Sequence, residues 1–477
     1  MGEQWAVTPC VAGSNPVVPP NLYRDQPVPF FIGNFMDKNG VLSYYKKMNK
    51  DKIEPRLLKG FADFLPERMI VRQKMIQAIK EVYELFGFLP LETPALEHAD
   101  ILIGKYGDEG EKLLYKFLDN GSRPVALRYD LTVPLARVVA QYPELKKPFK
   151  RYQVAPVWRA ENTQKGRFRE FYQCDADIIG TSSLMADAEI LSLIWRTLKT
   201  LKVDNFTISI NNRKVLDGLL KDLGLPEENN PAVLRIIDKV EKISEEDFKK
   251  ELLAIIGDDK KMQSVLDFMN SQGDLDLVQK LFPSTKVGAD ELKEVCRHVE
   301  ALGVDQKNYK IDFSIVRGLD YYTGTVYETK LNDLPKFGSV FSGGRFDNLI
   351  SKFIDQSIPA VGASIGLDRL FAALEELGVM KKIKSTAKVL IVNLDNGLAD
   401  EYQKIASLLR DNKINAMIYF EQISLGQQLS YASEMEIPYV LIYGSKEKEA
   451  GIYVLKDMVN KAQREIKSED LMKEIVL

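Results

Sequence analysis

The run Arg169-Glu-Phe-Tyr-Gln-Cys-Asp-Ala-Asp-Ile constrains the fold of this 477-residue chain more than any other segment. Its residues alternate with a period of two, which is the period of a β-strand. One face of such a strand would carry Tyr172, Cys174, Ala176 and Ile178, and the other Phe171, Gln173, Asp175 and Asp177. The first face suits a core, and the second suits the floor of a polar site. The charged segment 159–169 predicts a long antiparallel hairpin with an earlier strand, 152–158.

Other sequence patterns predict the helices and strands in the rest of the chain. Apolar residues at helical spacing predict a helix over 66–86, which Pro66 begins and Gly87 ends, and another helix over 132–141. Residues 214 to about 300 are charged and helical, and strand signals resume over 309–329 and around Val340. The C-terminal part alternates apolar strands with amphipathic helices, which predicts a small α/β domain. Its expected strands are 389–394 and 438–443, and its expected helices are 398–410 and 424–436.

The expected domain boundaries follow these changes of pattern. An N-terminal arm, rich in Pro, Asn and Gly, covers 1–50. The main domain is discontinuous (51–212 and 309–380), because a helical insertion (213–308) interrupts it. The C-terminal α/β domain covers 385–477.

The scarce residue types exclude several classes of protein. The chain has three cysteines, two histidines and no Cys-x-x-Cys pair. A structural zinc site, a disulfide framework and a histidine-dependent nucleophile are therefore not expected. The net charge of −3 confines nucleic-acid contacts to local basic patches. No apolar run approaches the roughly 20 residues that span a bilayer, and no targeting peptide is recognised, so no membrane contact and a cytoplasmic location are expected.

Arginines in unusual settings are the candidate anion ligands. Neither the glycine-rich phosphate loop nor the dinucleotide fingerprint occurs, so bound phosphates would need cations instead. The candidates are Arg159, Arg167, Arg169, Arg317 and Arg369. The last of these falls in the first turn of a predicted helix, where a cation opposes the helix dipole unless an anion such as Asp368 offsets it. Each arginine alone is more simply a solvated or ion-paired side chain. Their fixed offsets from Gly and Asp together favour a common site.

With their neighbours, these arginines resemble the motifs of class II aminoacyl-tRNA synthetases. Trp158-Arg-Ala-Glu followed by Gly166-Arg-Phe-Arg-Glu-Phe resembles motif 2, and Gly362 to Arg369 resembles motif 3. Phe86-Gly-Phe-Leu-Pro-Leu-Glu-Thr-Pro resembles motif 1, whose final proline lies at the dimer interface in the class.

Further runs resemble the histidyl-tRNA synthetase family within that class. Arg317-Gly-Leu-Asp-Tyr-Tyr-Thr-Gly-Thr-Val-Tyr-Glu and Ser342-Gly-Gly-Arg-Phe-Asp are similar to two signatures of the family, and Leu127-Arg-Tyr-Asp-Leu-Thr and Tyr172-Gln-Cys-Asp-Ala-Asp match its amino-acid pocket. The resemblance runs from about residue 54 to the C-terminus. Two variant positions, Asp130 and Cys174-Asp-Ala-Asp177, make the chain similar to eukaryotic-type members.

The resemblance implies a role for each matching residue. Histidine would be held by Asp130, Thr132 and Asp177 at its ammonium, with Gln173 close by, and covered by Tyr321 and Tyr322 at its imidazole. ATP would meet Phe171 at the adenine, Glu161 on the nucleotide, Arg159 at the α-phosphate, and Arg167 and Arg369 at the outer phosphates. Arg159 would also bind the histidine carboxylate. Arg317 would take the place of a general base, since a carboxylate is already deprotonated at neutral pH.

The same resemblance implies an α+β fold and a biochemical activity. The catalytic domain would be built on a mostly antiparallel sheet, the helical insertion would lie along the tRNA acceptor stem, and the C-terminal α/β domain would bind the anticodon. The loop 165–169 would be the main contact with the acceptor end. The activity would be ligation of histidine to tRNA(His) with ATP as substrate and Mg²⁺ as cofactor. The metal would need no cage of protein ligands, and the enzyme would be a homodimer.

Two alternatives follow from the same motifs. The chain could be a non-catalytic relative of this family, either a tRNA-sensing module or a regulatory subunit of histidine biosynthesis. Such relatives tend to lose the signature arginines and pocket acids that this sequence retains, and the biosynthetic regulator also lacks the C-terminal part. It could also be a class II synthetase for another amino acid, which would leave the Arg317-Gly-Leu-Asp-Tyr-Tyr run unexplained.

Overall fold

The computed structural model describes residues 54–163, 166–240, 243–271, 273–316 and 321–475. The arm expected at 1–50, part of the acceptor-end loop, and Arg317 therefore lie outside the described residues. Leu58–Leu477 form one of the two units of the chain.

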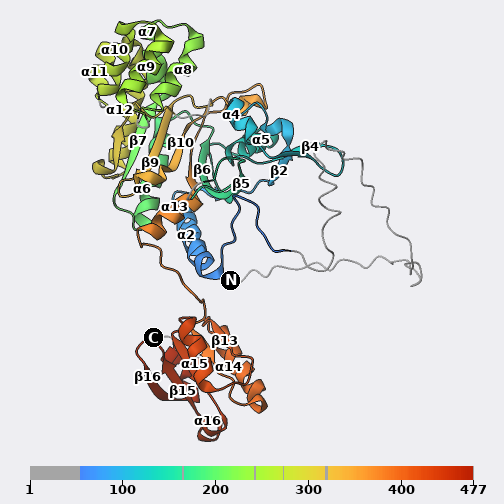
Figure 1. Cartoon of the computed structure of the whole chain (residues 1–477). Helices are drawn as coiled ribbons and strands as arrows, with labels where there is room; N and C mark the ends of the chain where they lie inside the picture. Colours follow the sequence, from blue (N-terminus) through green and yellow to red (C-terminus); the bar gives the residue numbers. More distant parts are fainter. Residues whose placement is uncertain (1–53, 164–165, 241–242, 272, 317–320, 476–477) are drawn as a thin grey trace, which may run out of the picture. The chain divides into compact units, whose positions relative to one another are not determined.

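A mostly antiparallel, eight-stranded sheet forms the centre of the larger part (Figure 1), with the order β1-β5-β6-β11-β10-β9-β7-β8. Only the β1–β5 and β7–β8 pairs are parallel within it. Its strands are β1 (Leu89–Pro90), β5 (Phe149–Trp158), β6 (Glu170–Ile179), β7 (Phe206–Asn212), β8 (Tyr309–Ile311), β9 (Thr325–Leu331), β10 (Ser339–Arg345) and β11 (Ala360–Gly366). The predicted hairpin is confirmed, because β5 and β6 pair along their whole lengths from Phe149↔Ile179 to Trp158↔Glu170.

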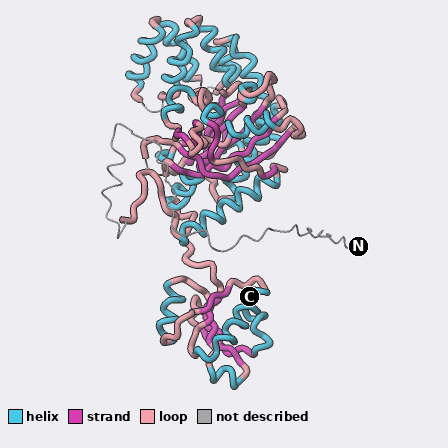
Figure 2. Tube along the Cα trace, turned by 90° about the vertical axis from the view of Figure 1, so that its right-hand side faces the viewer, coloured by secondary structure: helices cyan, strands magenta, loops and turns pink. Residues whose placement is uncertain are grey.

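Helices cover the apolar face of this sheet. In Figure 2 the magenta strands of the larger part lie among cyan helices. The covering helices are α2 (Pro66–Leu85), α6 (Leu184–Thr200), α12 (Lys286–Ala301) and α13 (Leu367–Glu376). Their apolar stripes share one core with Cys174, Ala176 and Ile178 of β6. The predicted helix over 66–86 is thus confirmed: Pro66 stands in its first turn, and Gly87 follows it at a φ of 76° that favours glycine.

The larger part also contains a smaller, three-stranded antiparallel sheet. A second apolar core includes Tyr129, Ile179 and Phe346. The smaller sheet consists of β2 (Leu96–His98), β4 (Pro124–Leu127) and β3 (Lys116–Leu118), with helices α3 (Ala99–Leu102), α4 (Gly107–Lys112) and α5 (Thr132–Gln141) nearby in the chain. The helix predicted over 132–141 is confirmed by α5.

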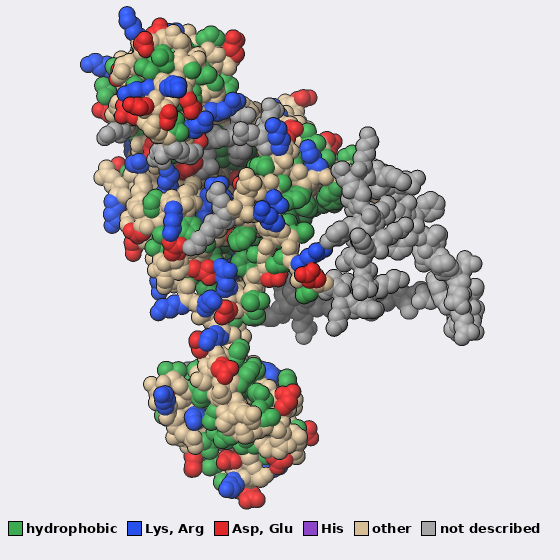
Figure 3. All heavy atoms as spheres, in the orientation of Figure 1, with side chains coloured by type: hydrophobic (Ala, Val, Ile, Leu, Met, Phe, Trp, Pro, Cys, Tyr) green, Lys and Arg blue, Asp and Glu red, His purple; other side chains and the backbone are tan. Residues whose placement is uncertain are grey.

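Residues 213–301 form a run of helices, as their charged, helical pattern predicts: α7 (Arg213–Leu223), α8 (Asn230–Ile237), α9 (Glu245–Ile256), α10 (Asp259–Asn270), α11 (Leu275–Leu281) and α12. Side chains of Asn212, Ser244, Asp258 and Asp274 accept backbone N–H groups at the starts of four of them. On the face drawn in Figure 3, Lys and Arg are interspersed with Asp and Glu over these helices.

The C-terminal part is a five-stranded mixed sheet with the order β13-β12-β14-β15-β16 and helices on both faces. Its strands are β12 (Val389–Ile391), β13 (Ala416–Ile418), β14 (Tyr439–Ile442), β15 (Ile452–Asp457) and β16 (Ala462–Lys467), and its helices are α14 (Ala399–Asp411), α15 (Leu425–Glu434), α16 (Ser445–Ala450) and α17 (Leu471–Ile475). The two predicted strands and two predicted helices correspond to β12, β14, α14 and α15. The elements predicted from the sequence do not include β13, the β15–β16 hairpin, α16 and α17.

One expectation is corrected between 309 and 329. The segment is not continuous strand, because β8 ends at Ile311 and β9 begins at Thr325. The irregular backbone after β8 is held from the side, since the buried Asn211 amide donates to the carbonyls of Phe313 (3.3 Å) and Ile315 (2.9 Å). No helix of the described chain is long and apolar enough to cross a membrane.

Candidate active site

A cavity of about 300 Å³ lies on the polar face of β6. Its walls come from β6, β10, β11, the hairpin loop, the start of α5 and the segment before β9. The structure brings together all of the predicted site residues that it describes: Asp130, Thr132, Arg159, Glu161, Arg167, Phe171, Gln173, Asp177, Tyr321, Tyr322 and Arg369. The predicted alternation of β6 is confirmed, because Phe171, Gln173, Asp175 and Asp177 all line the cavity.

Asp130 is held in place by the start of helix α5. Its Oδ1 atom accepts the backbone N–H groups of Thr132 (3.1 Å) and Val133 (3.0 Å) and the hydroxyl of Tyr106 (3.2 Å). Its Oδ2 atom is buried and has no hydrogen-bond partner within the described chain. Burial raises the pKa of this carboxyl, although the donors around Oδ1 oppose the shift. One oxygen is therefore fixed and the other is left for a donor from a ligand.

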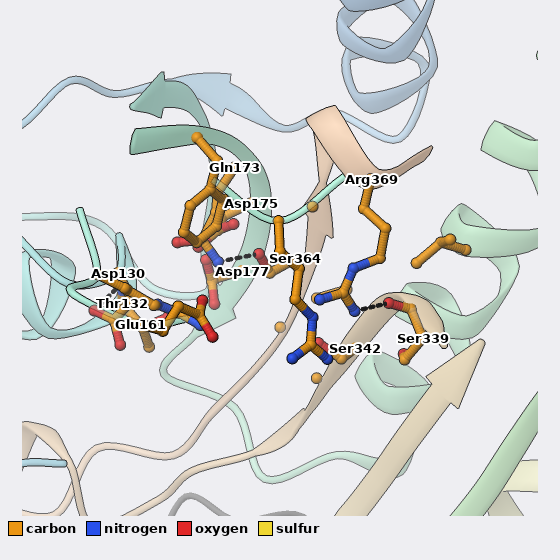
Figure 4. A pocket seen from close by; sticks show the side chains of 18 of the residues that line it. Asp130, Thr132, Glu161, Gln173, Asp175, Asp177, Ser339, Ser342, Ser364 and Arg369 are labelled. Atoms are coloured by element: carbon orange, nitrogen blue, oxygen red, sulfur yellow. Dashed lines mark hydrogen bonds between the residues drawn. The ribbon is translucent and has the colours of Figure 1, made fainter. Parts of the chain in front are cut away.

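The β6 residues add further buried acceptors. Gln173 donates through Nε2 to Ser364 Oγ (2.7 Å), which leaves its Oε1 without a described partner (Figure 4). Burial raises the pKa of Asp175 to about 7 and that of Asp177 to about 6. The guanidinium of Arg151 lowers both pKa values in part, and each shift is increased by neighbouring carboxylates.

Arg151 is the cation beneath these acids. It lies on β5 directly across from Asp177, and its side chain is fully buried. Its Nη2 atom lies 2.8 Å from Asp177 Oδ2 and donates to the carbonyl of Leu131 (3.0 Å). The contact with Asp177 is an ion pair without hydrogen-bond alignment, because Oδ2 counts no hydrogen-bond donor among the described residues.

Glycine makes room for the acids at the neighbouring strand. Gly362 of β11 pairs with Asp177 of β6, and a Cβ atom at Gly362 would stand 1.9 Å from Asp177 Oδ1. No side chain fits there without moving the carboxylate. A steric clash with Asp177 therefore explains why the motif 3 run has a glycine at position 362.

The other end of the cavity is lined by arginines and an aromatic ring. The Arg159 guanidinium lies 5.1 Å from the centre of the Phe171 ring and 4.2 Å from that of Tyr129, and its Nε donates to the Tyr129 carbonyl (3.1 Å). Arg369, in the first turn of α13, donates through Nη1 to the carbonyl of Ser339 (2.7 Å; Figure 4). This end offers cations and a π face, whereas the first end offers anions.

Two tyrosines complete the wall near the acids. The rings of Tyr321 and Tyr322 are 4.8 Å apart, and Tyr321 lies edge-on to Phe346. The next residue anchors them, because Thr323 donates its N–H to the carbonyl of Arg345 (2.8 Å) and its hydroxyl to Asp347 (2.9 Å). This anchor joins the two signature runs of the sequence.

Asp175, Ser364 and Arg151 were not predicted as site residues, and the first two of them line the cavity. Asp175 could have been selected from its place on the polar face of β6. Ser364 lies on β11 opposite Asp175, and Arg151 opposite Asp177, so both depend on strand pairing that the sequence does not reveal. Arg317 lies outside the described residues, and its role stays a prediction.

Comparison with known proteins identifies the family of this chain. The histidyl-tRNA synthetase family model matches residues 60–370, and the anticodon binding domain model matches residues 388–476. The chain belongs to the histidyl-tRNA synthetase family. Its fold is accordingly the class II catalytic domain with an anticodon-binding domain, as predicted.

Individual relatives extend over most of this family member. The chain is 46% identical over 423 residues to a histidine–tRNA ligase of Rhodopirellula baltica, covering 87% of this chain and 96% of the relative. It is 44% identical over 440 residues to that of Clostridium tetani, covering 89% and 99%. The crystal structure of histidyl-tRNA synthetase from Nostoc sp. PCC 7120 has a TM-score of 0.81 at 36% identity, covering 89% of this chain and 99% of that one.

These relatives discriminate between the alternatives. They are named as ligases for histidine, which favours that activity over a tRNA-sensing module and over a class II synthetase for another amino acid. They are bacterial, whereas the motif variants at Asp130 and Asp177 resemble eukaryotic-type members; the family is the same in both cases.

Proposed function

We propose that this cavity is the site where the chain, a histidine–tRNA ligase, activates histidine with ATP. One observation carries the proposal: at one end of a single cavity, buried carboxylate and amide oxygens accept no hydrogen bond from the described residues, and at the other end lie arginines and Phe171. An α-ammonium group has three donors and no acceptor, so it suits the first end. ATP has phosphates and an aromatic base, so it suits the second.

At the acidic end, Asp130 and Asp177 bind the ammonium of histidine together with Thr132. Gln173 contributes its free Oε1 atom. Tyr321 and Tyr322 cover the imidazole. The buried setting supports this assignment, since an ion pair gains strength where water is excluded.

At the nucleotide end, Phe171 stacks on the adenine and Glu161 helps to hold the nucleotide. Arg159 binds the α-phosphate and the histidine carboxylate, and Arg167 and Arg369 bind the outer phosphates. Arginine suits this work because it stays charged and offers a planar set of donors.

The chemical step needs no proton acceptor. A carboxylate oxygen of histidine attacks the α-phosphorus of ATP, the bond to the leaving pyrophosphate breaks, and histidyl-adenylate remains. The main obstacle is the approach of two anions, which positioning and fixed cations relieve. Arg159, and Arg317 from outside the described residues, are the catalytic residues that bridge carboxylate and α-phosphate. In the second step the terminal 3′-hydroxyl of tRNA(His) attacks the histidyl carbonyl, and AMP leaves.

Mg²⁺ is proposed to enter with ATP and to neutralise phosphate charge. Among the described residues no group of three His, Cys, Asp or Glu side chains could hold a metal ion. Mg²⁺ commonly binds substrate phosphates, waters and one or two carboxylates. Glu161 is the carboxylate that lines the cavity beside Arg159 and Arg167.

The remaining assignments concern the whole enzyme. We propose a catalytic domain at 51–212 and 309–380, an insertion at 213–308 that lies along the acceptor stem, and an anticodon-binding domain at 385–477. The loop 165–169 contacts the acceptor end. The enzyme acts as a homodimer in the cytoplasm.

Pyrophosphate exchange on three variants tests the residue roles. Asp177→Asn should raise the KM for histidine about tenfold or more with a smaller effect on ATP, and Arg369→Ala should do the reverse. Arg317→Ala should slow exchange by about a hundredfold or more without lowering the melting temperature. Normal exchange by Arg317→Ala would exclude its proposed role.

A further inference from the structure

A buried ion pair beneath the nucleotide end takes no direct part in the chemistry described above. Arg72 of α2 and Asp368 of α13 are 2% and 3% exposed, and Arg72 Nη2 donates to Asp368 Oδ1 over 2.8 Å. The sequence suggested that Asp368 offsets the neighbouring Arg369. The structure instead pairs Asp368 with a cation from another helix, which leaves the Arg369 guanidinium directed to Ser339 and the cavity.

The second oxygen of Asp368 reaches the strand that floors the cavity. Asp368 Oδ2 accepts the backbone N–H of Tyr172 over 2.7 Å. Tyr172 follows Phe171 directly, and Asp368 precedes Arg369 directly. One carboxylate therefore ties together the backbones that carry the proposed adenine platform and a proposed phosphate ligand.

Arg72 extends the same connection to the hairpin loop. Its guanidinium lies between two rings, 4.5 Å from the centre of Phe64 and 4.4 Å from that of Tyr172. Phe64 in turn meets Phe168 edge-on at 6.4 Å. Phe168 stands next to Arg167, another proposed phosphate ligand, and lines the cavity itself.

A purely stabilising role explains this arrangement poorly. A fully buried ion pair often adds little net stability over an apolar pair of similar size, because both charges lose their hydration. The pair also fixes direction, because it connects α2, α13 and β6 close to the origins of two nucleotide-facing side chains, Phe171 and Arg369.

We infer that Arg72 and Asp368 are positioning residues for ATP, which set the aim of Arg369 and the placement of Phe171. The inference rests on the proposed nucleotide roles of those two residues. Neither Arg72 nor Asp368 is among the residues that line the cavity for histidine at its acidic end, so the effect should be selective for ATP.

The chain contains a matched control pair between the same two helices. Arg68 of α2 donates to Glu375 of α13 through two contacts of 2.9 and 2.6 Å. This pair is partly exposed, it makes no hydrogen bond to β6 among the described residues, and Glu375 lies two helical turns beyond Asp368. It joins the helices without reaching Tyr172.

The experiment measures the KM for ATP and for histidine by pyrophosphate exchange with the full-length enzyme. Asp368→Asn should raise the KM for ATP about tenfold or more and change the KM for histidine less than about threefold. Glu375→Gln should leave both constants within about twofold. An unchanged KM for ATP in Asp368→Asn would overturn the inference, as would equal effects of the two substitutions.

A double variant separates positioning from stability. Asp368→Asn leaves Arg72 as an unpaired buried cation, so the single variant is expected to lose stability. In Arg72→Met with Asp368→Asn the unpaired charge is gone, and the melting temperature should recover while the KM for ATP stays raised. If the KM recovers together with the melting temperature, the pair acts only through stability.

Arg369→Ala distinguishes failure of this inference from failure of the proposed function. A raised KM for ATP in Arg369→Ala with a normal one in Asp368→Asn rejects the positioning role alone. A normal KM for ATP in Arg369→Ala rejects the nucleotide role on which the inference depends.

Discussion

Three carboxylates, Asp130, Asp175 and Asp177, are buried around the acidic end of the cavity with one arginine, Arg151, beneath them. Burial without enough donors penalises their ionised forms, which is why their pKa values are raised. Buried acids clustered in this way lower the stability of the fold, and a bound cationic group offsets that cost. The residues that bind substrate are therefore the ones expected to reduce the stability of the ligand-free enzyme.

Replacing Asp175 by Asn should stabilise the ligand-free enzyme at high pH. The folded-state pKa of Asp175 is about 7 against an ordinary 3.8. Because the folded-state pKa is raised, ionisation of Asp175 destabilises the folded enzyme. This destabilisation is absent below pH 3.8, grows between pH 3.8 and pH 7, and is constant at higher pH. The free energy of unfolding should then be about 1 to 4 kcal/mol higher in Asp175→Asn at pH 8 and equal to wild type near pH 4. Urea denaturation at both pH values measures this, and a less stable variant at pH 8 would contradict it.

Histidine binding should weaken as the pH falls from 8 to 6. Protonation of Asp175 and Asp177, with pKa values of about 7 and 6, removes negative charge that faces the ammonium. We expect the dissociation constant to rise about tenfold, by isothermal titration calorimetry. The imidazole of the substrate also titrates near pH 6.5, so Asp175→Asn serves as the reference. A pH dependence as steep in the variant as in the wild type would contradict a contribution from Asp175.

At this scale, alternation predicted which β6 side chains face the ligand, since it depends only on neighbouring residues. Arg151 escaped prediction because an arginine within a strand is ordinarily solvent-facing. Its burial is a consequence of the pairing Arg151↔Asp177, which joins residues far apart in the sequence.

The strands β6, β10 and β11 approach so closely that glycine is required between them. A Cβ atom at Gly343 would lie 2.0 Å from the Gly362 carbonyl oxygen, and one at Gly362 would lie 1.9 Å from Asp177 Oδ1. The sheet thus sets the position of the acid through backbone spacing.

Gly362→Ala should impair histidine use more than ATP use. The added methyl group must displace Asp177 or separate β11 from β6, so the KM for histidine should rise about tenfold or more in pyrophosphate exchange. Gly426→Ala is the control, because Gly426 begins α15 with open space around its Cβ position. Equal histidine KM values in both variants would show that Gly362 does not fix Asp177.

Elements with a strong local pattern were predicted correctly, including α2, α5 and the β5–β6 hairpin. The β15–β16 hairpin was missed because β16 is exposed at all but one of its residues, which removes the alternation that identifies a strand. Strand signals over 309–329 predict a strand that the structure interrupts, because the backbone carbonyls of Phe313 and Ile315 bond to the Asn211 side chain rather than to a neighbouring strand.

The C-terminal part has two apolar cores of its own, one on each face of its sheet. Neither contains a residue of the larger sheet. Removal of residues 385–477 should therefore leave pyrophosphate exchange within about tenfold of the full-length rate, whereas charging of tRNA should fall by about a hundredfold or more, because one of two linked binding regions is lost. Both assays on the same truncated chain check this. Loss of exchange would indicate that the catalytic part depends on the C-terminal domain.

The most direct test of the whole account is ATP–pyrophosphate exchange with each of the twenty amino acids, in the presence of Mg²⁺ and without tRNA. The account predicts exchange with histidine alone, because the cavity combines acceptors for an ammonium, a tyrosine pair for the imidazole and cations for ATP. Exchange driven by a different amino acid, or by none, would contradict the assignment of this cavity.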